Sequence, residues 1–99
     1  MTFEQIAYFL AVADVKSFVQ AARRCGISQP SLTNAIKSLE TTLGGPLFVR
    51  AATGSELTEF GRQVYPLLAR LHRDRLRVLK QASKWHATRP VGNLRTASA

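Results

Sequence analysis

Glycine and proline residues fix where the middle third of the chain can be helical. Gly26 is the residue type best able to take the left-handed conformation that ends a helix, and Gly44-Gly45-Pro46 ends the next helix. Between them, Ser28 is suited to cap a helix, and Pro30 falls in its first turn, where a missing N–H removes no hydrogen bond. The pattern predicts two helices joined by a tight glycine turn.

The helix after this turn has two chemically different faces. At 100° per residue its apolar side chains gather on one side, which predicts contact with a core; they are Leu32, Ile36, Leu39 and Leu43. The opposite side presents short polar groups and one cation, namely Pro30, Thr33, Asn34, Lys37 and Thr41. Such a face fits the DNA major groove, which is about 12 Å wide, but it also fits an ordinary solvated helix.

Two helices are predicted before this one, and the second of them is the helix that Gly26 ends. Apolar residues recur at helical spacing from Phe3 to about Ala13, and a second helix runs from Ser17 to Cys25. Ser17 and Gln20 fit a capping box, in which each side chain satisfies a backbone donor at the other position. The second helix has a short buried stripe of Phe18, Ala21, Ala22 and Cys25.

A hairpin is predicted after the third helix. The strand-like runs are Leu47–Arg50 and Glu56–Thr58, and Gly54 gives the intervening segment its turn freedom. Three helices followed by a two-stranded wing predict a mainly α fold, a winged helix-turn-helix. The spacing of Ala22, Gly26 and Leu32 also fits helix-turn-helix units.

Thr58 can cap a long final helix that runs to about Trp85. Apolar residues recur along it every seven positions, and this spacing usually marks contact with another helix; they are Leu57, Val64, Leu71, Val78 and Trp85, with Phe60, Leu67 and Leu68 widening the stripe. We therefore expect a homodimer, or a higher homo-oligomer, through Val64, Leu68, Leu71 and Val78. Pro66 lies too deep for the first turn, which predicts a kink or a local break.

The net charge of the chain points to a polyanionic partner. Lysine and arginine total 14 against 6 acidic residues, a formal charge of +8, so double-stranded DNA is the first expectation and an anionic membrane the second. Much of the excess lies on the long helix, at Arg62, Arg70, Arg73, Arg75, Arg77, Lys80 and Lys84. A basic amphipathic helix that binds a membrane or another protein is therefore the alternative to sequence-specific DNA recognition.

An enzyme or a metalloprotein is not expected. Cys25 is the only cysteine and falls on a predicted buried stripe, where a thiol usually serves packing; a redox sensor would need it exposed and acidic. His72 and His86 have no carboxylate at triad or metal spacing, so no catalytic residue, metal or cofactor is predicted. The longest apolar run, Ile6 to Ala13, is too short to span a bilayer. We expect a cytoplasmic protein with no membrane partner.

Individual side chains of the third helix suit base recognition. Gln29 and Asn34 can each pair with adenine through two hydrogen bonds, and Pro30 can contact a thymine methyl. Lys37 can reach a guanine edge or a phosphate, and Arg50 of the wing can contact phosphate or the minor groove.

The motifs together resemble those of LysR-type transcriptional regulators. The resemblance covers roughly residues 3–70 and links helix, turn, wing and linker helix in order. It rests on Phe18 with Ala21-Ala22, on Ser28-Gln29-Pro30-Ser31-Leu32-Thr33, and on Ile36, Leu39-Glu40, Leu43-Gly44, Pro46-Leu47-Phe48, Leu57-Thr58-Glu59 and Gly61.

The resemblance implies a role for each part of a bacterial transcription regulator. Base-reading positions would be Gln29, Pro30, Thr33 and Asn34, and positions for DNA-backbone contact or helix docking would be Ser17, Ser28, Ser31, Lys37 and Arg50. The DNA-binding domain would span residues 1–58 and the dimerising linker helix residues 59–87. Residues 88–99 would be a linker, with Asn93-Leu94-Arg95 similar to the first strand of an effector-binding domain. A small-molecule effector is expected only if that C-terminal domain exists.

Two positions and one segment depart from the family pattern. Asn34 stands where many members have arginine, so base preference should differ, and Val19 replaces a frequent serine or threonine. The wing tip, Ala51–Ser55, lacks the arginines that are common there, which implies a weaker hold on the DNA backbone.

Overall fold

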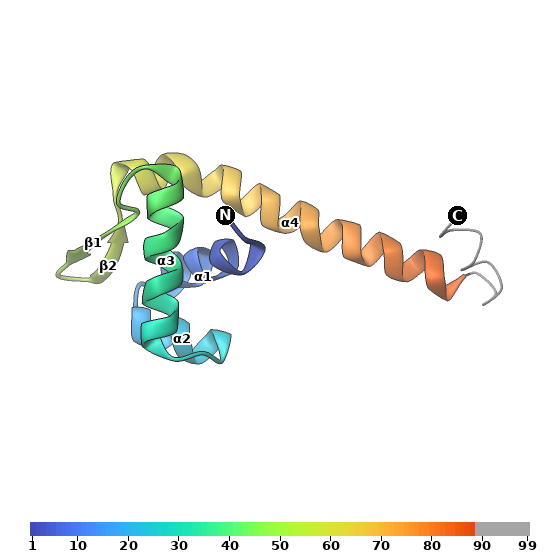
Figure 1. The fold of residues 1–99 in the computed structure, drawn as a ribbon, viewed down its shortest axis with the longest axis horizontal. Helices are drawn as coiled ribbons and strands as arrows, with labels where there is room; N and C mark the ends of the chain where they lie inside the picture. The colour runs from blue at the N-terminus through green and yellow to red at the C-terminus, as the bar shows by residue number, and fades with distance from the viewer. Residues whose placement is uncertain (89–99) are drawn as a thin grey trace.

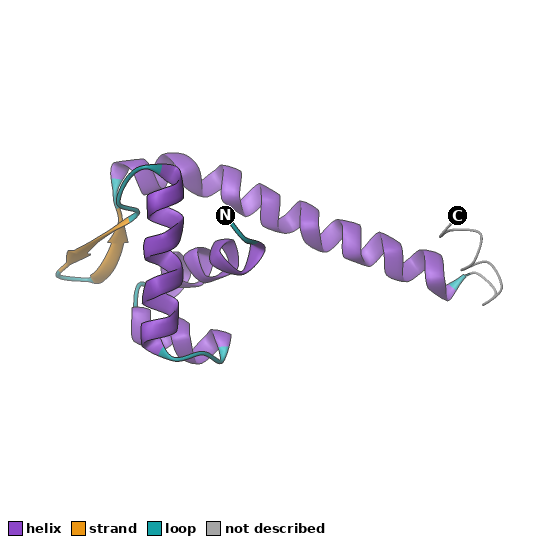
Figure 2. Cartoon of the chain, viewed as in Figure 1, coloured by secondary structure: helices purple, strands orange, loops and turns teal. Residues whose placement is uncertain are grey.

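The computed structural model describes residues 1–88, which form four helices and a two-stranded antiparallel sheet. In chain order the elements are α1 (Phe3–Val15), α2 (Phe18–Cys25), α3 (Gln29–Leu43), β1 (Phe48–Ala51), β2 (Gly54–Leu57) and α4 (Glu59–Ala87). The first three helices form a compact head with the strands at its side, and α4 extends far beyond it (Figures 1 and 2). The predicted fold class is confirmed. The linker and strand predicted near the C-terminus lie outside the described residues.

Side-chain caps define where each head helix begins. Thr2 and Gln5 form a complete capping box at α1, with both backbone N–H to side-chain oxygen distances at 3.1 Å, and sequence reasoning missed it. At α2 the Ser17 hydroxyl accepts a hydrogen bond from the Gln20 N–H at 3.1 Å. The structure shows only this half of the box predicted there. Ser28 caps α3 as predicted.

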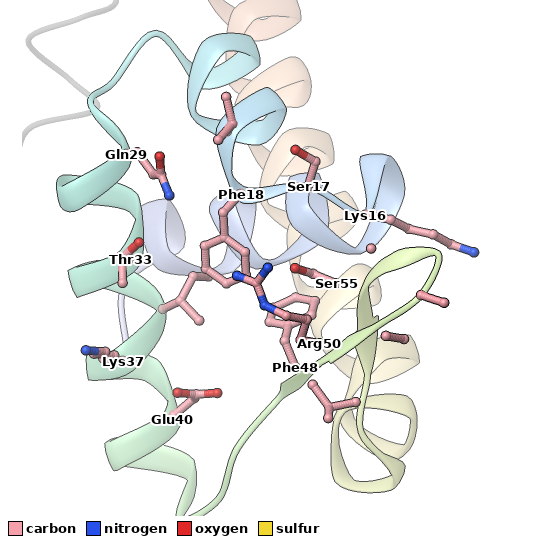
Figure 3. Close-up of a pocket in the computed structure, with 16 residues that line it drawn as sticks. Lys16, Ser17, Phe18, Gln29, Thr33, Lys37, Glu40, Phe48, Arg50 and Ser55 are labelled. Atoms are coloured by element: carbon pink, nitrogen blue, oxygen red, sulfur yellow. The ribbon is translucent and has the colours of Figure 1, made fainter.

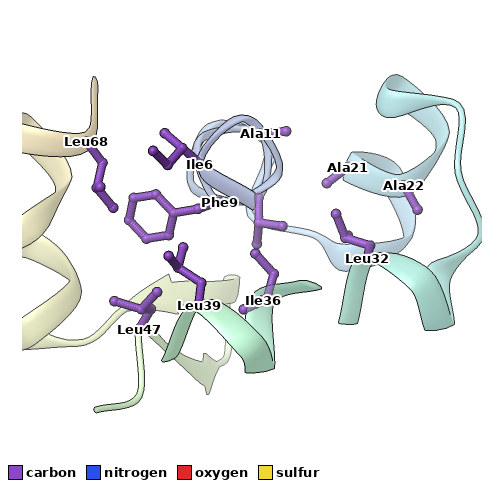
Figure 4. Packing of buried hydrophobic residues seen from close by; sticks show 11 residues of the cluster. Ile6, Phe9, Ala11, Ala21, Ala22, Leu32, Ile36, Leu39, Leu47 and Leu68 are labelled. Carbon is purple, nitrogen blue, oxygen red and sulfur yellow. The ribbon is translucent and has the colours of Figure 1, made fainter. Parts of the chain in front are cut away.

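A single apolar core joins the three head helices to the wing and to α4. Phe9 of α1 is fully buried near its centre, with Leu39 of α3 close to it, and Leu32 of α3 packs by Ala21 and Ala22 of α2 (Figure 4). Leu68 closes the core from α4. The apolar face predicted for the third helix is therefore the face that packs.

The hairpin register differs from the prediction. β1 begins one residue later than expected because Leu47 turns fully into the core. Gly54 pairs with Ala51 in the ladder rather than lying in the turn. Its φ is +118°, and a Cβ atom there would lie 2.4 Å from the carbonyl oxygen of Lys16. Glycine is thus required by a close approach to the α1–α2 turn.

The long helix α4 passes through Pro66 without the local break that the sequence suggested. Proline leaves the carbonyl four residues earlier without its helical partner. That carbonyl belongs to Arg62, which is exposed, so water can satisfy it. No helix in residues 1–88 has the length and apolar character needed to cross a membrane.

Candidate nucleic-acid interface

An open groove of about 760 Å³ lies between α3, the start of α2 and the wing. Gln29, Thr33 and Lys37 of α3 line one side, and Arg50 reaches toward its middle from β1 (Figure 3). Lys16 and Ser17 line it from the α1–α2 turn. Three segments that are distant in the sequence thus share one concave surface.

One face of α3 forms one side of the groove. Gln29, Thr33 and Lys37 follow one another at intervals of four, so they lie along one side of the helix. Ile36, which is buried, lines the floor of the same groove with its exposed edge. Glu40 accepts a hydrogen bond from the Leu47 backbone N–H at 2.7 Å, which ties the end of α3 to the start of the wing.

The groove suits an anionic ligand. Lys16, Lys37 and Arg50 line it, and Glu40 is the one carboxylate among its lining residues. One oxygen of Glu40 is already engaged by the Leu47 N–H. Polar side chains between the cations can serve as hydrogen-bond donors and acceptors, which is the arrangement expected for a surface that binds phosphates and reads bases.

The predicted site residues fall into two groups. Those that line the groove are Gln29, Thr33, Ser17, Lys37 and Arg50. Those that are exposed but do not line it are Pro30, Asn34, Ser28 and Ser31. In the second group, Pro30 and Asn34 lie on the outer face of α3 beside the groove, and the two serines lie at the helix start.

Hydrogen bonding distinguishes the two serines. The Ser28 hydroxyl accepts a hydrogen bond from the Ser31 N–H at 3.2 Å and donates one to the Ser31 hydroxyl oxygen at 2.8 Å. Ser28 therefore uses its proton within the cap, whereas the hydroxyl proton of Ser31 remains available for a ligand.

Sequence reasoning missed Lys16 and Ser55 as groove residues. Lys16 takes a left-handed conformation, with φ +56°, at the end of α1, and its carbonyl accepts a hydrogen bond from the Ser55 N–H at 3.0 Å. The only available signal was its place immediately before the cap Ser17, which is too weak to identify a binding residue.

Glu56 holds a charged contact at the edge of the wing. Its carboxylate accepts a hydrogen bond from the Thr53 hydroxyl at 2.6 Å and lies 3.4 Å from the ammonium nitrogen of Lys16. The Thr53 hydrogen bond, followed by Lys16, lowers the pKa of Glu56 below its ordinary value of 4.5. The carboxylate is therefore ionised at neutral pH, and only acid below that value would discharge it.

Part of the apolar stripe on α4 packs against the chain's own core. Leu68 is only 4% exposed, so it has no surface left for another copy, and Val64 packs half-buried against the same core. Within a single chain, therefore, Leu68 and much of Val64 face the core and not the solvent. The α4 side chains that remain exposed at seam spacing are Leu67, Leu71, Val78 and Trp85.

The described part of the chain offers little support for a reactive thiol or a metal site. Cys25 is half-buried and packs against the core. No group of three or more His, Cys, Asp or Glu side chains within residues 1–88 is placed to hold a metal ion. The basic residues of α4 are exposed and do not line the groove.

Comparison with known proteins identifies relatives of the head. Residues 3–62 match the family described as bacterial regulatory helix-turn-helix protein, lysR family. The HTH-type transcriptional regulator IlvR of Caulobacter vibrioides is 47% identical over 66 residues, covering 67% of this chain and 22% of that protein. BudR of Klebsiella aerogenes, another HTH-type transcriptional regulator, is 48% identical over 65 residues, covering 66% and 46%. The chain spans less than half the length of these curated relatives.

A solved structure matches a longer part of the chain than the 3–62 segment that matches the family. The crystal structure of the CbnR_DBD–DNA complex superposes with a TM-score of 0.78 at 32% identity, covering 87% of this chain and 99% of that chain. This share exceeds residues 3–62, so the likeness includes part of α4.

Proposed function

The chain belongs to the lysR family of bacterial regulatory helix-turn-helix proteins, and we propose that it binds specific double-stranded DNA sequences as part of a transcription regulator. The observation that carries the proposal is the groove, whose lining combines cations from α3, the wing and the α1–α2 turn with polar side chains. In this arrangement α3 enters the major groove, and the wing lies on the backbone or in the minor groove. Selection of bound sequences from random duplexes tests the proposal.

Base recognition is assigned to the N-terminal half of α3. Gln29 and Thr33 read bases from the groove side, and Pro30 and Asn34 read them from the outer face beside it. Gln29 and Asn34 suit adenine, and Pro30 suits a thymine methyl. The contact that Asn34 makes with its base is therefore short and uncharged.

Backbone contacts are assigned to Ser17, Ser28, Ser31, Lys37 and Arg50. Ser17 lies at the N-terminus of α2, where free backbone N–H groups and the helix dipole favour a phosphate. Of the two serines at the start of α3, Ser31 is the better donor because its hydroxyl proton is not used in the cap. Lys37 and Arg50 supply charge on opposite sides of the groove.

Replacing Arg50 with alanine is expected to weaken binding to all duplex sequences alike. Loss of one phosphate contact should lower the slope of log affinity against log salt by about one unit. Titrations of a cognate and a scrambled duplex over a salt series measure this. Arg77→Ala on α4, outside the groove, is the matched control. An unchanged salt slope for Arg50→Ala would remove Arg50 from the backbone contacts.

The protein is proposed to act as a homodimer through α4. Leu71, Val78 and Trp85 recur every seven residues and remain exposed, and Leu67 adjoins them. A helix with such a stripe buries it most readily against a second copy. Two heads joined in this way would bind two half-sites related by symmetry.

Replacing Val78 with aspartate is expected to weaken self-association. Val78 is 67% exposed, so the change should leave the head folded while placing a charge in the seam. Sedimentation velocity over a concentration series measures the effect. Val49→Asp is the control, because this valine is 52% exposed on the wing and away from α4. Equal sedimentation of the Val78→Asp variant and the wild type would argue against this seam.

The remaining assignments follow from the family. Its members are transcriptional regulators, so we assign no catalytic role, and we place the protein in the cytoplasm with the DNA. A small-molecule effector requires a C-terminal domain. The basic face of α4 keeps membrane binding as the second candidate, and co-sedimentation with anionic vesicles against capture by duplex DNA separates the two.

A further inference from the structure

The wing is anchored to the α1–α2 turn at several points beyond its own ladder. The Ser55 N–H donates to the Lys16 carbonyl at 3.0 Å. The Lys16 ammonium lies 3.4 Å from the Glu56 carboxylate, which also accepts the Thr53 hydroxyl proton. Gly54 lies so close to the Lys16 carbonyl that no side chain fits between them. Backbone and side-chain contacts therefore hold the same corner of the wing.

This anchored corner lies directly across the ladder from Arg50. In the register of the hairpin, Arg50 pairs with Ser55, the residue whose N–H bonds Lys16, and Val49 pairs with Glu56. A shift of β2 relative to the turn would therefore move the backbone of Arg50 with it. Figure 3 shows Arg50, Ser55 and Lys16 around one side of the groove.

The other end of the anchor is the start of α2. Lys16 immediately precedes Ser17, whose hydroxyl caps α2 and which lines the groove. The anchor thus fixes the distance between two phosphate-binding positions, one on the wing and one at the helix N-terminus.

From this geometry we infer that Glu56 is a positioning residue for DNA binding. By holding Lys16, it sets the angle of the wing at which Arg50 reaches the DNA backbone. This role rests on the proposed function, because it acts through the Arg50 contact.

Charge alone predicts the opposite effect of removing Glu56. Loss of a carboxylate from a chain of net charge +8 makes the chain more basic, and a more basic chain binds DNA more tightly. A positioning role predicts weaker binding. The sign of the change therefore separates the two explanations.

The experiment compares Glu56→Gln with Glu59→Gln. Glu59 is a matched control because it also forms an ion pair and has a lowered pKa, but its partner, Arg62 at 2.7 Å, lies on the same helix α4 and not in the α1–α2 turn. Glutamine at position 56 can still accept the Thr53 hydrogen bond, so the change isolates the Lys16 contact. We expect Glu59→Gln to bind a cognate duplex as tightly as the wild type or more tightly.

Glu56→Gln should bind more weakly than Glu59→Gln by up to about fivefold, which is the upper end of the range for loss of an exposed ion pair. Arg50→Ala should also cost less affinity in the Glu56→Gln background than in the wild type.

Two results would overturn the inference in distinguishable ways. If Arg50→Ala weakens wild-type binding but Glu56→Gln binds as tightly as Glu59→Gln, the positioning role is wrong and the Arg50 contact stands. If Arg50→Ala has no effect in either background, the Arg50 contact fails and the positioning role fails with it.

Discussion

Replacing Phe9 with alanine is expected to lower the free energy of unfolding by about 3–5 kcal/mol. Phe9 is fully buried, and its ring centroid lies 5.4 Å from that of Phe48 in the wing and 6.1 Å from that of Tyr65 in α4. The ring therefore joins α1 to both neighbouring elements. A domain of this size is stable by about 5–15 kcal/mol, so the loss is a large fraction of the total. Urea unfolding followed by circular dichroism measures it.

Phe3→Ala is the control for this change. Phe3 lies on the same helix but is 48% exposed, and its ring lies 5.2 Å from the Arg75 guanidinium. Its replacement should cost about 1 kcal/mol or less, as is usual for surface positions. If Phe9→Ala cost no more than Phe3→Ala, Phe9 would not be the residue that joins the head, the wing and α4.

Replacing Gln29 or Asn34 with alanine is expected to relax sequence preference at one base position each, by about 1–3 kcal/mol. Binding to unrelated sequences should change little, because these side chains supply no charge to the phosphates. Competition of a cognate duplex against single-base variants measures the preference. Gln29 lines the groove and Asn34 lies on the outer face of α3, so the two should affect different base pairs.

Thr41→Ala is the control on the same helix. Thr41 is exposed near the end of α3, does not line the groove, and already donates its hydroxyl proton to the Lys37 carbonyl at 3.0 Å. It should leave base preference unchanged. An unaltered preference for Asn34→Ala would show that the outer face of α3 does not read bases.

The helices and their buried faces were predictable because their determinants are local. Helical spacing placed Leu32, Ile36 and Leu39 on one face, and all three are buried. Gly26 and Gly44 end α2 and α3 in left-handed conformations, as expected from the sequence. Such features depend on neighbours within a few residues, so a single sequence carries them.

The wing register and the α4 seam depend on distant parts of the chain. Because glycine favours turns, the sequence alone predicts Gly54 in the turn, whereas its place in the ladder is set by the close approach of the Lys16 carbonyl. Leu68 adjoins the seven-residue stripe that contains Leu71, and periodicity cannot show that the core already covers it. The groove was predictable on its α3 side, whereas Lys16 and Ser55 enter it only through the packing of the turn against the wing.

Selection from random duplexes tests the central claim, sequence-specific DNA binding by α3, most directly. The wild-type chain and a variant with both Gln29 and Asn34 changed to alanine are each taken through rounds of binding, and the recovered duplexes are sequenced. We predict that the wild type enriches one shared half-site, repeated with two-fold symmetry, and that the variant loses this enrichment while still retaining duplexes. Recovery of duplexes by the wild type with no shared sequence would contradict the account, because the protein would then be a basic DNA-binding helix without base recognition.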